Sequence, residues 1–388
     1  MTDAVATQDT VTQLVSAIRR VGREVPGAAG QIAAVCTGHD YSKPGKPKID
    51  WDDPAAKDAL VSALVNDATA LVDVFKDAEL EEPAAAALAL LALVAGQDVE
   101  PAEGSDGTDG RWRIARKVAE DRVISVNDPE ARHTRKSPEA RRDGYRAHVA
   151  ADPGTGIITD EKLTGAAGAE NSDAAVAAEF VTAEAAGEGG AVSGGGDRND
   201  AGGQLTWYGD SAYGTGDLRA AIAGAGHQAV IKPWRLLPAV EGGFTADDFT
   251  VNAVARTVTC PAGITRHVTA KNAVIFGAAC RGCPLRQQCT TAKEGRTLHL
   301  HEHDGLLRAA RADWAADPGL RQDYSTHRPH VERAIAQVAT WRGRRLKLRY
   351  RGAAKNHAWL KRRTAAVNLR NLLGKGLARR DGTWILAT

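Results

Sequence analysis

Two carboxylates stand where they could hold a metal ion. Asp210 follows the apolar run Leu205–Tyr208, which predicts a strand that ends beside it. Glu332 belongs to a predicted helix that begins near Pro329. Carboxylate oxygens are ligands that Mg²⁺ prefers, and open α/β sheets bind ligands beyond the carboxyl ends of their strands. The alternatives are that Asp210 only caps the following turn and that Glu332 only pairs with Arg328.

The chain becomes strongly basic after Glu332. Residues 333–380 carry 15 Lys and Arg and no acid, whereas residues 1–110 carry 19 Asp and Glu against 8 Lys and Arg. A basic block in a chain of net charge +2 indicates a polyanionic partner, most often nucleic acid, with a solvated helix face as the alternative. The candidate DNA-binding residues are Arg328, Arg333, Arg342, Arg344, Arg345, Lys347, Arg349 and Arg351.

Four of the five cysteines are clustered. Cys260, Cys280, Cys283 and Cys289 have the spacing C-x19-C-x2-C-x5-C, and the C-x2-C pair is typical of chelation. Four thiolates would hold a structural Zn²⁺ and leave no open coordination position for chemistry. Nearby histidines at positions 299, 301 and 303 could replace one thiolate, and four reduced, partly buried thiols are the alternative.

Composition limits the class of protein. The 388 residues are 43% hydrophobic and 25% charged, which is ordinary for a globular chain of two or three domains. No apolar run is long enough to span a membrane, and no signal peptide is evident, so the default expectation is a cytoplasmic protein. The chain has no P-loop, no dinucleotide-binding glycine fingerprint and no G-x-S-x-G elbow.

The sequence pattern predicts four regions, whose helices and strands must position these residues. Residues 1–110 read as helices at 4–25, 53–75 and 83–94 with an irregular stretch between the first two. Residues 111–235 read as a mixed α/β sheet that contains a short strand at 123–126, a hairpin at 144–163 and a flexible glycine-rich loop at 187–203. Residues 236–305 form a Cys-rich insertion of short strands, and residues 306–388 are helical with a basic surface.

Several motifs occur together in an order that resembles a known family. They are Trp-Tyr-Gly-Asp-Ser-Ala-Tyr-Gly around Asp210, Val-Ile-Lys-Pro, Cys-Pro-Ala-Gly, Cys-Arg-Gly-Cys-Pro-Leu-Arg-Gln-Gln-Cys, His-Arg-Pro-His-Val-Glu-Arg around Glu332, and Leu-Arg-Tyr-Arg-Gly before a Leu- and Asn-rich helix. The combination resembles the DDE transposases of bacterial insertion sequences, in the branch numbered eleven-eighty-two, related to the IS-four-type enzymes. The resemblance covers essentially the whole chain.

The resemblance implies an RNase H-like fold in which three carboxylates bind two Mg²⁺ (or Mn²⁺) ions for DNA cleavage and strand transfer. By position, Asp210 is the second acid, Glu332 is the third and Arg328 matches the arginine of the family's signature. The tyrosine and lysine of the IS-four-type signature do not match, because Ser325 and Ala339 occupy their spacings. The implied partner is double-stranded DNA, both insertion-sequence ends and target, bound by a homodimer.

The first of the three acids is where this sequence departs most from the family's pattern. Relatives carry it in an Asp-Ser-Thr strand upstream of the segment that resembles residues 4–10, so this strand, central in the sheet, is expected to be missing from a truncated chain. Asp3 is too terminal to substitute, and Asp128 is the fallback. We therefore expect an inactive or impaired transposase. A non-catalytic DNA-binding remnant and a standalone Mg²⁺ nuclease that uses Asp128, Asp210 and Glu332 are the alternatives.

Overall fold

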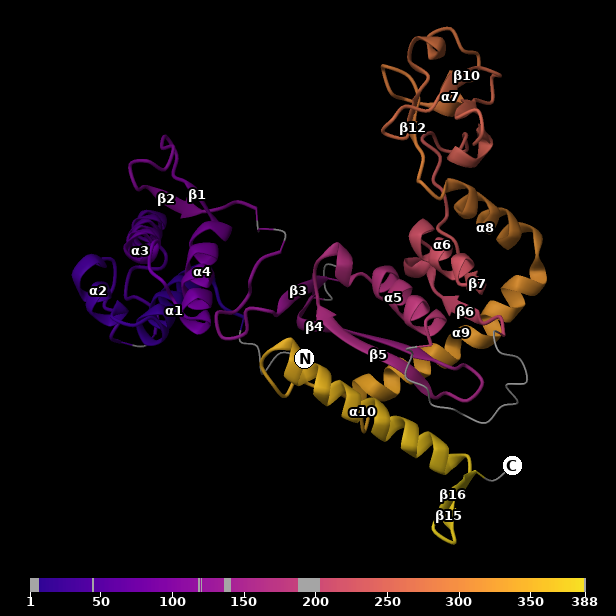
Figure 1. Cartoon of the computed structure of the whole chain (residues 1–388). Coiled ribbons are helices and arrows are strands. Elements are labelled where there is room, and N and C mark those ends of the chain that lie inside the picture. The colour runs from indigo at the N-terminus through magenta and orange to yellow at the C-terminus, as the bar shows by residue number, and fades with distance from the viewer. Residues whose placement is uncertain are drawn as a thin grey trace. The chain divides into compact units, whose positions relative to one another are not determined.

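The computed structural model describes residues 7–43, 45–117, 119, 121–135, 141–187 and 203–386, without the side chains of residues 135 and 141 (Figure 1). The chain forms two compact units. The first comprises residues 1–147, 161–171 and 338–366, and the second comprises residues 148–160, 172–337 and 367–388. Asp3 and most of the predicted glycine-rich loop, residues 188–202, lie outside the described residues.

Four helices build the core of the first unit: α1 (Thr10–Glu24), α2 (Ala28–Val35), α3 (Pro54–Phe75) and α4 (Glu82–Gln97). The predicted start of α3 is confirmed, because Asp53 accepts a hydrogen bond from the Ala55 N–H and Pro54 is the first helical residue. Helix α2 was not predicted. It forms because Gly27 adopts φ +79° after α1 ends, which turns the chain and lets Ala28 and Ile32 reach the core.

The predicted strand at Val123–Val126 is wrong. These residues are buried, but glutamine side chains replace the neighbouring strand as hydrogen-bond partners. The Val123 N–H donates to Gln97 Oε1, and the Val123 carbonyl accepts from the side-chain amides of Gln97 and Gln13. The Val126 N–H donates to Gln8 Oε1. The segment therefore satisfies its buried backbone without a sheet, as buried polar groups must.

The strands that lie wholly or partly in the first unit pair in antiparallel fashion. The predicted hairpin is confirmed as β4 and β5, and a strand that the sequence did not predict, β3, pairs with Arg141–Gly144 at the start of β4. Strand β4 enters the second unit at His148, and β5 leaves it at Asp160. The strands are β1 (Val99–Pro101), β2 (Trp112–Ile114), β3 (Arg132–Arg135), β4 (Arg141–Ala151), β5 (Ile158–Gly165), β13 (Thr340–Trp341) and β14 (Arg344–Arg345).

A parallel pair of strands forms the centre of the second unit. Strand β6 (Thr206–Gly209) pairs with β7 (Gln228–Ile231), and α6 (Gly216–Gly224) crosses between them. Helix α5 (Asp173–Ala185), capped by Ser172, packs on the same core, where Val181, Leu218, Ile222 and Ile231 are buried together. The predicted strand before Asp210, residues 205–208, is confirmed as β6 within one residue at each end.

The Cys-rich region has a small core of its own, centred on Phe249, Val258, Val274, Phe276 and Leu298. Its strands form two antiparallel sheets, as the predicted short-strand pattern requires. The elements are β8 (Thr250–Asn252), β9 (Thr257–Thr259), β10 (Thr265–His267), β11 (Ala273–Ile275), α7 (Arg286–Cys289) and β12 (Thr297–His299).

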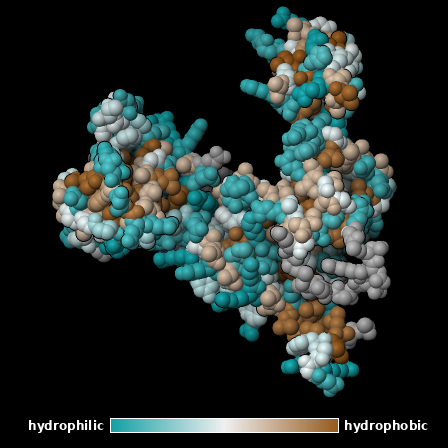
Figure 2. All heavy atoms as spheres, in the orientation of Figure 1, coloured by the Kyte–Doolittle hydropathy of each residue, from teal (hydrophilic) through white to brown (hydrophobic). Residues whose placement is uncertain are grey.

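Three long helices and a hairpin complete the chain: α8 (Asp304–Ala316), α9 (Pro318–Ala339), α10 (Ala353–Gly374), β15 (Leu377–Arg380) and β16 (Thr383–Leu386). Helix α9 begins eleven residues before the predicted start, so Pro329 is an interior residue rather than the first one. Apolar side chains gather at the end of α10 and on the hairpin, where Leu373, Trp384 and Leu386 are exposed (Figure 2).

The mixed α/β class is confirmed, but the described strands form several small sheets rather than one. Strands β3, β4 and β5 form one sheet and β6 and β7 form another. None of the helices in the described part of the chain combines the length and apolarity that a membrane span requires.

Asp67 is a buried carboxylate that organises the loop after α2. Its Oδ1 accepts the Thr37 N–H at 2.8 Å, and its Oδ2 accepts the Gly38 N–H at 2.8 Å and the Tyr41 hydroxyl at 2.6 Å. The pKa of Tyr41 is raised, first by burial and then by this carboxylate, so the hydroxyl stays a donor.

We predict that Asp67→Ala lowers the free energy of unfolding by about 2–4 kcal/mol, because three donors lose their acceptor in a buried site. Urea denaturation measures the change. Asp73→Ala, an exposed position on the same helix, is the control and should change stability by less than about 0.5 kcal/mol. Equal effects of the two substitutions would contradict the role given to Asp67.

Candidate functional site

Asp210 lies immediately after β6, as the sequence predicts. Its Oδ1 accepts the Ala212 N–H at 2.9 Å and so caps the 3₁₀ turn Ser211–Tyr213. Asp210 therefore does cap this turn, but the cap occupies only one of its two carboxylate oxygens. The other oxygen, Oδ2, points to the Arg328 guanidinium, and the side chain is 47% exposed.

Arg328 brings Asp210 and Glu332 together. One nitrogen, Nη2, lies 3.2 Å from Asp210 Oδ2 and 3.6 Å from Glu332 Oε1. The Arg328 side chain is 12% exposed, whereas that of Glu332 is 68% exposed. The predicted pairing of Glu332 with Arg328 thus exists, and the same cation also holds the second carboxylate. Helix α9 achieves this because residues 328 and 332 lie one turn apart on one face.

The sequence did not single out a second network beside this pair. The Tyr208 hydroxyl donates to the Asp323 carboxylate at 3.0 Å, and His327 Nδ1 lies 2.8 Å from the same carboxylate. The rings of Tyr208 and His327 are 4.8 Å apart. Burial raises the pKa of Tyr324, which lies in the same charged neighbourhood as Asp210 and Arg328. The 323–327 spacing of one helical turn was the available signal, but the predicted helix began too late to include it.

The two carboxylates could hold a divalent cation at the place that the guanidinium now occupies. Mg²⁺ is usually bound by one or two carboxylates, with water and substrate phosphate completing its octahedron. In the described residues, no group of three or more His, Cys, Asp or Glu side chains has a metal-binding arrangement. Among the described residues, the candidate site is therefore a carboxylate pair rather than a triad.

Asp128 is placed in the first unit and is 1% exposed. Its Oδ1 accepts the Tyr145 hydroxyl at 2.5 Å and the Gly352 N–H at 3.2 Å. Burial raises the pKa of Asp128, and the hydrogen bond from Tyr145 partly offsets this. The sequence predicted that a strand at residues 123–126 would end beside Asp128. Those residues form no strand, so Asp128 follows an irregular segment.

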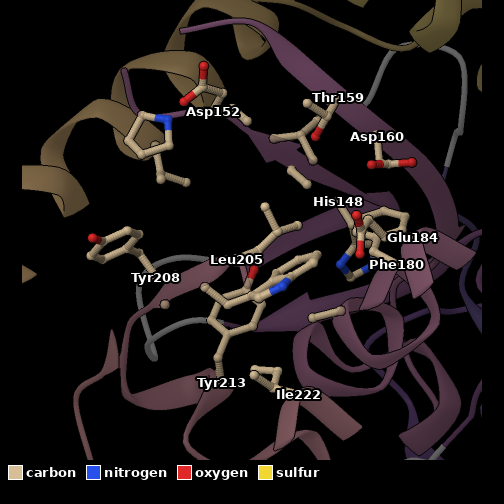
Figure 3. Close-up of a pocket in the computed structure, with 18 of the residues that line it drawn as sticks. His148, Asp152, Thr159, Asp160, Phe180, Glu184, Leu205, Tyr208, Tyr213 and Ile222 are labelled. Atoms are coloured by element: carbon tan, nitrogen blue, oxygen red, sulfur yellow. The ribbon is translucent and has the colours of Figure 1, made fainter. Parts of the chain in front are cut away.

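A cavity of about 450 Å³ lies beside Asp210 in the second unit (Figure 3). Arg328, Val331 and Ile335 of α9 line it, together with residues of β4, β6 and α5. Its acidic side chains include Asp160, whose pKa is raised by burial.

The four clustered cysteines line one small cavity of about 20 Å³. All are free thiols; Cys280 and Cys289 are buried, and Cys260 and Cys283 are half-buried. Burial raises the pKa of Cys289, while Arg296 lowers it. The four thiols therefore lie around one cavity, but no three His, Cys, Asp or Glu side chains of the described residues have a metal-binding arrangement, and the zinc site stays a prediction.

The predicted DNA-binding cations are mostly exposed. Arg342 and Gly343 form a two-residue turn with φ of +50° and +75°, the signature of a type I′ hairpin, between β13 and β14. The turn presents its basic residues to solvent. The exposed cations are Arg333 in the second unit and Arg342, Arg344, Arg345, Lys347, Arg349 and Arg351 in the first.

Residues 257–373 match a protein family described as the transposase DDE domain. The matched stretch contains the clustered cysteines and Glu332 but not Asp210, and it spans less than a third of the chain. The match supports a DDE transposase and so implies DNA as a partner. No curated protein matches the chain, and no solved structure matches it.

We predict that Tyr208 titrates with a pKa of about 12, because burial and the hydrogen bond to Asp323 both disfavour the phenolate. The folded state then holds this proton more strongly than the unfolded state, so stability falls as pH rises from the ordinary value of 10.0 towards 12. Spectrophotometric titration of the wild type minus Tyr208→Phe measures the pKa. A difference spectrum that titrates at the ordinary value would contradict the network, and Tyr350→Phe serves as a solvent-exposed control.

Proposed function

We propose that this protein is a transposase of a bacterial insertion sequence, of the branch numbered eleven-eighty-two, and that Asp210 and Glu332 belong to its metal site. The observation that carries the proposal is the convergence of both carboxylates on Arg328 Nη2. The family match supports it independently, because it includes Glu332 and Arg328. An RNase H-like arrangement of the sheets is part of the proposal.

Each residue then has a role that its position allows. Asp210 Oδ2 and Glu332 Oε1 would hold Mg²⁺ or Mn²⁺, which acts as a Lewis acid toward a DNA phosphodiester when bound. Arg328 offsets one of the two negative charges, and a guanidinium at this position would also suit contact with a phosphate. Arg333 and the exposed cations of residues 342–351 would hold the DNA backbone.

The first acid and the assembly remain proposals. Asp128 would have to exchange its Tyr145 and Gly352 partners for a metal ion to serve as the first acid. Double-stranded DNA, as insertion-sequence ends and target, is the proposed substrate, and a homodimer is the proposed assembly. A DNA-binding remnant without cleavage is the second candidate, and the exposed basic hairpin at Arg342–Arg345 is the observation that favours it.

We predict that Asp210→Asn and Glu332→Gln each weaken Mn²⁺ binding by ~10-fold or more, because each removes a charged ligand. Titration calorimetry of the 388-residue protein measures the affinity. Asp313→Asn, an exposed acid on α8, should leave it unchanged. Unchanged Mn²⁺ affinity in both site variants would rule out the metal site.

Assays on DNA separate the candidate functions. Steeply salt-dependent duplex binding without cleavage in Mg²⁺ would favour the DNA-binding remnant. Cleavage that Asp128→Asn abolishes would favour a nuclease that uses Asp128, Asp210 and Glu332. Strand transfer by this chain that is lost on Asp210→Ala would overturn the expectation that it is impaired.

We also propose that Cys260, Cys280, Cys283 and Cys289 bind a structural Zn²⁺. Their common cavity and the tetrahedral preference of zinc for four thiolates support the proposal. The ion would have to draw the thiolates inward. It would stabilise a region whose core is small and would not take part in the reaction.

Metal analysis of purified protein is expected to find about one zinc per chain. Cys283→Ser should lower both the zinc content and the Tm, because one ligand is lost. Cys36→Ser changes a thiol of the other unit and should preserve the zinc content. Zinc-free protein whose Tm is insensitive to a chelator would exclude a structural zinc.

A further inference from the structure

A separate cavity of about 490 Å³ lies in the helical part of the first unit, and its volume is typical of small-molecule sites. Helices α1 and α2 and the loop that follows α2 line it. Its apolar lining consists of Gly22 from α1 and of Ala29, Ile32 and Ala33 from α2. The two helices come close at Gly22, where an added Cβ would lie 2.8 Å from Ile32 Cδ1. Small residues therefore leave room between two packed helices.

Two arginines of α1 also line this cavity. Arg19 and Arg23 lie one helical turn apart, an arrangement in which like charges repel each other. Arg19 Nη1 donates to the Lys43 carbonyl at 3.2 Å, and Arg23 is exposed. In the described part of the chain, neither guanidinium has a carboxylate partner. A bound anion would relieve the repulsion between them.

Asp40 lines the cavity as well, but its charge is already matched. The Lys43 ammonium lies 2.9 Å from Asp40 Oδ2, and the Ser42 hydroxyl and N–H donate to Oδ1. Hydrogen bonds from Ser42 and then Lys43 lower the pKa of Asp40 to about 2. Burial and then Asp67 raise the pKa of Cys36 to about 11, so this lining thiol adds no negative charge at neutral pH. The cavity therefore keeps the positive charge of its two arginines.

A histidine of the loop after α2 offers an unused hydrogen-bonding atom. His39 Nε2 is buried and has no hydrogen-bond partner among the described residues. The His39 ring packs edge-on against that of Tyr41, with the ring centroids 5.4 Å apart. A buried polar atom without a partner is costly. Because His39 lines the same cavity as the arginines, a ligand that they hold could supply the missing partner.

We propose that this cavity binds a small-molecule phosphate monoester with an apolar body. A phosphate monoester carries about two negative charges near neutral pH and has three strong acceptor oxygens, which suits two arginines and a histidine. A carboxylate would bring only one charge. The apolar body would lie against Ile32 and Ala33. The inference goes beyond the proposed DNA chemistry, because it assigns a small-molecule ligand to residues far along the chain from Asp210 and Glu332.

Titration calorimetry of the full chain with phenyl phosphate tests the proposal. Phenyl phosphate should bind, and Arg23→Gln should weaken its affinity about tenfold or more, because a charge-assisted contact is lost. Lys76→Gln removes an exposed charge elsewhere in the same unit and should leave the affinity unchanged. Ala33→Trp, which places a large side chain at the cavity, should abolish binding, whereas Ala34→Trp, exposed on the same helix, should not.

His39→Phe separates a ligand contact from a structural one. The substitution keeps an aromatic ring and removes both ring nitrogens. It should weaken phenyl phosphate binding without lowering the Tm, because Nε2 has no partner to lose among the described residues. A lower Tm with unchanged affinity would contradict the role given to His39.

Three further results would overturn the proposal. Absence of binding, or equal affinity of the wild type and Arg23→Gln, would remove the anion site. Benzoate that binds as tightly as phenyl phosphate would show that the arginines do not select a doubly charged ligand. Tighter binding of a 5′-phosphorylated DNA oligonucleotide than of phenyl phosphate, with the same loss in Arg23→Gln, would assign the arginines to nucleic acid.

Discussion

The charge arrangement around Arg328 is the constraint on which the candidate site depends. A mostly buried guanidinium lies between Asp210 and Glu332, which come from a strand end and a helix more than a hundred residues apart. Two carboxylates this close repel each other unless a cation stands between them. The Arg328 guanidinium is that cation, and it couples the two carboxylates to each other.

Helix α9 positions Arg328 and Glu332. Residues 328, 331 and 335 share one face, so the helix supplies both the site arginine and a wall of the cavity. Pro329 interrupts the backbone ladder beside Arg328, because it has no N–H for the Ser325 carbonyl. The Tyr208, Asp323 and His327 network ties the preceding turn of α9 to β6, the strand that ends just before Asp210. Neighbouring turns of α9 therefore position the charged side chains of the candidate site.

Glutamine residues hold the apolar segment 123–126 outside any sheet. Residues 123–126 have the apolar character of a strand, yet their backbone bonds go to Gln8, Gln13 and Gln97. These bonds give buried backbone groups the partners that a neighbouring strand would otherwise supply.

Local signals in the sequence were enough to predict several elements. Asp53-Pro54 began a helix, Asp152–Gly156 turned a hairpin, and the run before Asp210 formed a strand, because capping and turn chemistry act over a few residues. The sequence missed α2 and β3, whose own patterns are short and which depend on packing or pairing with other segments. It placed the start of α9 at Pro329, because proline more often begins a helix than interrupts one.

Which charged residues meet depends on the packing of distant elements. The sequence named Asp210, Glu332 and Arg328, but their convergence on one nitrogen depends on how α9 packs beside β6. It offered Asp128 as a further acid, and the structure gave that carboxylate to Tyr145 and Gly352 in a buried environment. Spacing along the chain fixes which residues share a turn, whereas distance between elements follows from packing, which no local pattern encodes.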